Sequence, residues 1–73
     1  MELETITRTG LAELKGRQAE VRMGKETVRG EIIYDELDAT YILYREGKKP
    51  NVPLQPGQKL ICGNEAYILG EDI

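Results

Sequence analysis

The side chains that usually carry out catalysis are almost absent from this sequence. It contains no histidine and no serine, and its single cysteine, Cys62, has no imidazole partner to activate it. The sequence therefore supplies few side chains that could act in nucleophilic or acid–base catalysis. One cysteine can form neither an internal disulfide nor a zinc ligand set. The sequence predicts a protein that is not an enzyme and that holds no metal or other cofactor.

Two short charged clusters remain as candidates for ligand binding. The acidic cluster comprises Asp35, Glu36 and Asp38. It lacks the spaced oxygen ligands of a calcium loop and is typical of a solvated turn. The basic cluster comprises Arg45, Lys48 and Lys49. These three cations can contact phosphate, or they can simply form a solvated hairpin tip that keeps a sheet edge from aggregating.

The aromatic side chains are four tyrosines, because the chain has no Phe and no Trp. Exposed tyrosines can stack on the bases of a single-stranded ligand. A core without other aromatics also needs their bulk, so we expect Tyr34 and Tyr41 inside, with their hydroxyls at the rim. Tyr44 and Tyr67 are then the two candidates for a surface or an interface.

Length and charge limit both stability and partners. The 73 residues form one domain, 1–73, and a core of this size supplies about 3–5 kcal/mol of net stability, so oligomerisation is the remaining source of support. The formal charge of −3 disfavours generic binding to nucleic acid, since phosphate is repelled at long range. The acidic start of the chain has no apolar run, and we expect a soluble, cytoplasmic protein.

Hydrophobic periodicity predicts one helix and five strands. The helix covers Ile6 to Lys15, capped by Thr5 or Thr9 and ended by Gly16. The strands are expected at 18–23, 28–34, 39–44, 59–62 and 65–69, with a turn at Gly24-Lys25 and an irregular loop at 47–57. Gly30 inside the second strand indicates a bend or a close backbone approach. The fold class is mainly β, a small and strongly bent five-stranded antiparallel barrel with a short N-terminal helix.

Two short motifs occur along this chain. The first consists of Gly30, Ile32, Glu36, Ala39-Thr40 and Leu43. The second consists of Ile61, Cys62-Gly63 and Ala66-Tyr67-Ile68. Together they resemble the paired signature of the Sm-like (Lsm) family, whose SH3-type barrels assemble into rings and usually bind RNA. The resemblance implies an Sm-like barrel that binds single-stranded RNA or acts in RNA metabolism. The alternative is a structural or protein-interaction ring module that has lost RNA binding.

The resemblance also implies an RNA site, made of Glu36, Asp38, Thr40, Cys62, Gly63 and Asn64. Thr40 stands where relatives have an asparagine that reads uracil, and Asp38 and Cys62 stand where the base is sandwiched. Aspartate repels phosphate, and cysteine offers neither a charge nor a planar group. The base pocket is therefore expected to be atypical.

The same resemblance predicts a homo-oligomeric ring of about five to seven subunits, joined edge to edge through the last two strands. These strands carry few charges and would be adhesive if they were left open. The family register places Ile61 in the core, so that Cys62 points into the central opening of the ring. The other interpretation of Cys62 is a small buried hydrophobe.

Overall fold

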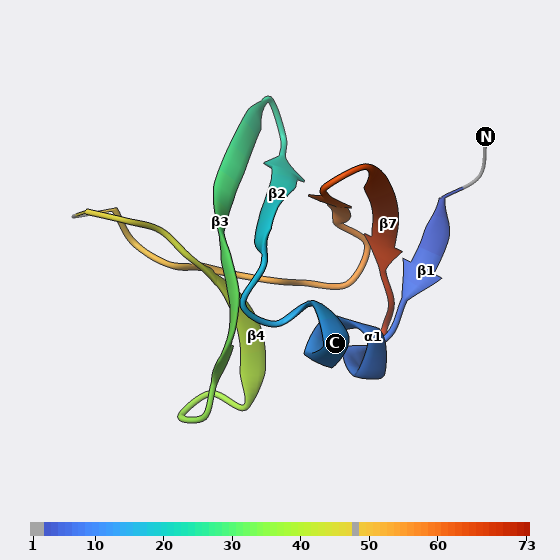
Figure 1. The fold of residues 1–73 in the computed structure, drawn as a ribbon, viewed down its shortest axis with the longest axis horizontal. Coiled ribbons are helices and arrows are strands. Elements are labelled where there is room, and N and C mark those ends of the chain that lie inside the picture. The colour runs from blue at the N-terminus through green and yellow to red at the C-terminus, as the bar shows by residue number, and fades with distance from the viewer. Residues whose placement is uncertain (1–2, 48) are drawn as a thin grey trace.

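The chain is mainly β with one short N-terminal helix, as the sequence predicts (Figure 1). The computed structural model describes residues 3–47 and 49–73. In chain order the elements are β1 (Glu4–Ile6), α1 (Arg8–Leu14), β2 (Gln18–Met23), β3 (Glu26–Asp35), β4 (Thr40–Tyr44), β5 (Val52–Pro53), β6 (Lys59–Cys62) and β7 (Glu65–Leu69).

The strands form one sheet in the order β1-β7-β6-β2-β3-β4-β5. Every neighbouring pair is antiparallel except β1 and β7, which run parallel. Within the described residues, β1 and β5 are the two free edges and do not pair with each other, so hydrogen bonds do not close the sheet. The prediction of a five-stranded, purely antiparallel, closed barrel is wrong in these three respects.

The two additional strands arise from segments that periodicity assigns elsewhere. Ile6, expected on the helix, ends β1 instead, where it lies opposite Leu69 and is buried in the core. β5 lies in the predicted irregular loop, because Val52 pairs with Leu43 and is buried along with the nearby Leu54. β7 lies between β1 and β6, and β6 lies between β7 and β2, so both strands have a partner on each side. The free edges expected on the last two strands are not present.

Helix α1 is capped between the two predicted cap positions, two residues after Thr5 and two before Thr9. Thr7, rather than Thr5 or Thr9, is the N-cap, and its side-chain oxygen accepts a hydrogen bond from the Gly10 amide at 3.4 Å. Leu11 and Leu14 face the core as expected. The predicted stop at Gly16 is confirmed by a φ of 90°, which glycine adopts without steric cost.

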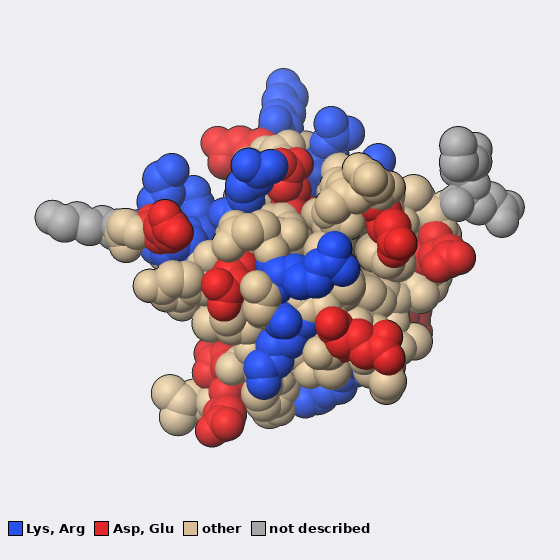
Figure 2. Space-filling view, viewed as in Figure 1, with Lys and Arg blue, Asp and Glu red and all other residues tan. Residues whose placement is uncertain are grey.

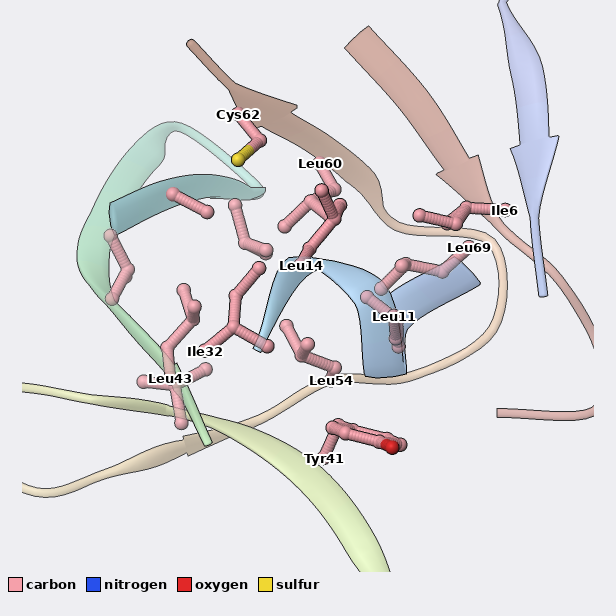
Figure 3. Close-up of a cluster of buried hydrophobic side chains, with 14 residues drawn as sticks. Ile6, Leu11, Leu14, Ile32, Tyr41, Leu43, Leu54, Leu60, Cys62 and Leu69 are labelled. Carbon is pink, nitrogen blue, oxygen red and sulfur yellow. The ribbon is translucent and has the colours of Figure 1, made fainter. Parts of the chain in front are cut away.

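Strands β2, β3 and β4 form a meander whose alternation follows the sequence. One face of this meander contributes Ala19, Val21, Val28, Ile32 and Leu43 to the core, which also contains Leu60 and Leu69 (Figure 3). Tyr41 is buried there, and Tyr34 packs against it edge to face, with the ring centres 5.0 Å apart. Both tyrosines were expected inside. β4 is covered on both faces, also as predicted.

Arg8 fastens the helix to the β3–β4 hairpin. Its guanidinium donates to the Tyr34 hydroxyl at 2.9 Å and to the Ala39 carbonyl at 3.3 Å, and it lies 5.5 Å from the centre of the Tyr34 ring. The Arg8 amide donates to the Asp72 carboxylate near the C-terminus at 3.2 Å. One residue thus joins the helix, the β3–β4 hairpin and the C-terminal end of the chain.

Candidate nucleic-acid interface

The first group of residues in the predicted RNA site lies at the β3–β4 turn. Glu36 and Asp38 are exposed, and Thr40 is half-buried at the start of β4. The Asp35 carboxylate accepts hydrogen bonds from the amides of Leu37 at 3.0 Å and Asp38 at 3.4 Å. This side chain-to-backbone bonding is typical of a solvated turn, which was one of the predicted roles of the acidic cluster.

The second group lies where β6 turns into β7. Cys62 is only 2 % exposed, and its thiol donates to the Gln18 carbonyl at 3.5 Å, while Gly63 and Asn64 form the exposed turn itself. Leu60 and Cys62 share the buried face, so the half-buried Ile61 points the other way (Figure 3). The register implied by the resemblance is wrong by one residue here. Cys62 belongs to the core and can neither line an opening nor stack on a base.

The sheet register keeps these two groups apart. β6 pairs with β2 through Glu20 and Ile61, and the next residue of β2, Ala19, lies opposite Gly30 on β3. Thr40 pairs with Asp35, which lies five positions beyond Gly30 on the same strand. At about 3.3 Å per residue this is about 16 Å along β3. The structure does not assemble a base pocket from the two groups.

A different set of polar side chains comes together on the outer face of the sheet. A hollow of about 450 Å³ lies over β3 and the start of the loop after β4. The charged and aromatic side chains that line it are Arg29, Glu31, Tyr44, Arg45, Glu46 and Lys49. The register pairs Glu31 with Tyr44, which places the tyrosine next to the outward-facing side chains of β3. Tyr44 is 48 % exposed, so one of the two expected surface tyrosines is accessible here.

The hollow contains both basic and acidic side chains, and the basic ones are in excess. Three basic side chains face two carboxylates, in a chain whose overall charge is negative. Arg45 and Lys49 belong to the predicted basic cluster, whereas Lys48 lies outside the described residues. Figure 2 shows basic side chains gathered over the β2–β3 hairpin and the loop after β4, with acidic ones among them. The hollow is therefore a local site in which basic side chains outnumber acidic ones.

Gly30 shapes the floor of the hollow. A Cβ atom at this position would lie 2.5 Å from the backbone oxygen of Tyr44, which is a severe clash. Only glycine allows β3 and β4 to approach so closely, and this confirms the close approach predicted for Gly30. Sequence reasoning did not group Arg29 with the basic cluster. The alternation of Thr27, Arg29 and Glu31 with buried residues was the signal that they share an outer face.

No helix within residues 3–47 and 49–73 is long and apolar enough to cross a bilayer. The same ranges contain no group of three or more His, Cys, Asp or Glu side chains arranged to hold a metal ion.

Comparison of the chain with protein-family models, with curated proteins and with solved structures finds no match in any of the three. Its function must therefore be inferred from the chemistry of its own surface.

Proposed function

We propose that this protein binds single-stranded RNA weakly, and without preference for uridine, at the hollow beside Tyr44. The observation that carries the proposal is the juxtaposition of an accessible aromatic ring with Arg29, Arg45 and Lys49. An aromatic platform beside cations is the usual arrangement for sequence-tolerant binding of single strands. In this arrangement a base stacks on Tyr44 while neighbouring phosphates contact the basic side chains.

The carboxylates of the hollow set limits on this binding. Glu31 and Glu46 repel phosphate, which lowers the affinity, whereas the phosphate contacts of the basic side chains make the binding sensitive to salt. Their oxygens can also accept a hydrogen bond from a ribose 2′-hydroxyl, the group that distinguishes RNA from DNA. The pairing of acidic and basic groups beside an aromatic ring therefore favours RNA over single-stranded DNA.

Membership of the Sm-like family and assembly into a homo-oligomeric ring belong to the same proposal. They are supported by the order of a helix followed by the bent meander β2–β3–β4, and by the close approach at Gly30. Because β6 and β7 are both paired within the chain, a ring would have to join the β1 edge of one copy to the β5 edge of the next. The proposed RNA hollow lies beside the β4–β5 side of such an interface.

A specific observation favours a protein-interaction module as the second candidate. Leu37 at the tip of the β3–β4 turn is 97 % exposed, and Ile61 and Ala66, which pair across β6 and β7, leave part of an apolar surface open. Exposed apolar side chains of this kind are common in surfaces that bind other proteins. This candidate predicts no measurable affinity for RNA.

Titration of short oligouridine and oligoadenosine RNAs at several salt concentrations, followed by fluorescence anisotropy, tests the first proposal. Tyr44→Ala should weaken binding of both RNAs by about 5- to 160-fold, since a stacked base is worth roughly 1–3 kcal/mol. Leu37→Ala, which removes another exposed apolar side chain, is the matched control and should change nothing. Equal affinities for Tyr44→Ala and Leu37→Ala would contradict the proposal, and no binding by the unmodified chain would favour the interaction module.

A further inference from the structure

A second hollow adjoins the first on the outer face of the sheet. It has a volume of about 360 Å³ and reaches Ile61 and Gly63 at the β6 side. Gln18 and Arg29 line both hollows, so the two form a continuous path across β3, β2 and β6. A strand bound with one base on Tyr44 and continuing along this path would bring its next phosphate over Arg29.

Arg29 already has a partner at this position. Its guanidinium lies 2.9 Å from the Glu20 carboxylate, and the two residues are directly opposite each other on β2 and β3. The Arg29 side chain is 73 % exposed, so a ligand can approach it from solvent. Glu20 also lines the second hollow. Its ion pair with Arg29 therefore lies where the path passes from one hollow to the other.

We propose that Glu20 is an internal competitor for the RNA phosphate, and that RNA must displace it from Arg29 to extend from the first hollow into the second. This inference rests on the proposed RNA binding at Tyr44. In the resting protein Arg29 is neutralised by Glu20, whereas the other two described cations of the first hollow, Arg45 and Lys49, can contact phosphate. The ion pair therefore sets both the affinity and the length of RNA that is bound.

The size of the effect follows from the exposure of the pair. Exposed ion pairs are worth about 0.2–1 kcal/mol, so releasing Arg29 should raise RNA affinity about 1.4- to 5-fold. One more phosphate contact should also steepen the slope of log affinity against log salt by about 0.7, the value for one contact to a single strand. The change in slope is specific for a new contact, whereas a gain in affinity alone can come from any lost negative charge.

The experiment measures affinity and salt slope for the intact chain, Glu20→Gln, Arg29→Gln and the double variant, with oligoadenosine as the probe. Glu20→Gln should bind more tightly with a steeper slope, and in the Arg29→Gln background the same change should leave the slope unaltered. Glu13→Gln removes an equal charge from an exposed position on α1 that lines neither hollow, and it serves as the matched control, with an unchanged slope. Circular dichroism of each variant verifies that the sheet is intact.

The outcomes separate the two proposals. If the intact chain binds RNA but Glu20→Gln has the same slope as Glu13→Gln, the competitor role is wrong and RNA binding at Tyr44 stands. If Tyr44→Ala has no effect while Glu20→Gln steepens the slope, the Arg29 contact is retained and the stacking site is wrong. If neither the intact chain nor Glu20→Gln binds RNA, both proposals are overturned.

Discussion

The pKa of the Tyr67 side chain depends on carboxylates beside it on β7 and β1. Its ring packs against the core, and its hydroxyl donates a hydrogen bond to the Glu65 carboxylate. Glu4 lies opposite it on β1. The carboxylate of Glu65 raises the pKa of Tyr67 above its ordinary value of 10.0, because it accepts the phenol's proton in a hydrogen bond and repels the phenolate. The acidic strand pair therefore favours the neutral phenol.

This shift predicts a loss of stability in alkali. The pKa of Tyr67 is raised in the folded state, so Tyr67 contributes to the free energy of unfolding fully below about pH 10. This contribution is lost as the pH rises through the pKa of the folded state. The free energy of unfolding in urea should fall above pH 10, and Tyr67→Phe should reduce that fall. Glu65→Gln should lower the pKa of Tyr67 in an ultraviolet titration. Tyr44→Phe, on another face, is the matched control, and an equal effect from both Phe variants would contradict the assignment.

At the scale of elements, the contact between β3 and β4 depends on one missing side chain. Gly30→Ala would place a methyl group 2.5 Å from the Tyr44 carbonyl oxygen, and backbone cannot move aside as a flexible side chain can. Overpacking of this kind costs about 1–3 kcal/mol, so the urea midpoint should fall accordingly. Thr27→Ala, an exposed change in the same strand, should have less than half that effect. Equal midpoints for the two variants would show that the strands separate without cost.

Elements with clear periodicity and turn residues were predictable from the sequence. The bounds of β6 and β7 agree with the expected strands at 59–62 and 65–69, because Gly63 and Asn64 mark the turn between two apolar runs. β1 could not be predicted, since three residues carry no period, and their extended form depends on pairing with β7. β5 is shorter still and includes Pro53. Short edge strands of this kind are specified by tertiary contacts rather than by local sequence.

The candidate site was predictable only in part. Arg45, Lys49 and a surface tyrosine were identified from their types, but their neighbours come from another strand. Arg29 joins them only through the register that pairs Glu31 with Tyr44, and no local pattern reports that register. Cys62 shows the opposite error, because the family resemblance set its face, whereas the simple alternation with the fully buried Leu60 places it in the core.

For the molecule as a whole, self-association depends on β1 and β5, the two free edges among the described strands. The expected adhesive edges on β6 and β7 are covered within the chain, by β2 on one side and β1 on the other. The remaining edges are three residues long at β1 and two at β5, and Pro53 removes one amide from the latter. Short strands and proline both protect an edge from uncontrolled pairing. Any association through them is therefore expected to depend on protein concentration.

The ring prediction can be tested at this scale by varying both concentration and salt. Each chain carries −3, so a ring of six or seven copies would carry about −18 to −21, and this repulsion is screened as the ionic strength rises. In sedimentation equilibrium the mass should increase from 8.2 kDa towards about five to seven times that value over the micromolar range, and more readily in 0.5 M than in 0.05 M salt. The urea midpoint should rise with protein concentration over the same range, because assembly stabilises only the folded chain. A mass that stays at 8.2 kDa at both salt concentrations, with a constant midpoint, would contradict the ring. The short edges of β1 and β5 would then be protective ends of a monomer, and the hollow beside Tyr44 would have to bind its ligand without help from a neighbouring subunit.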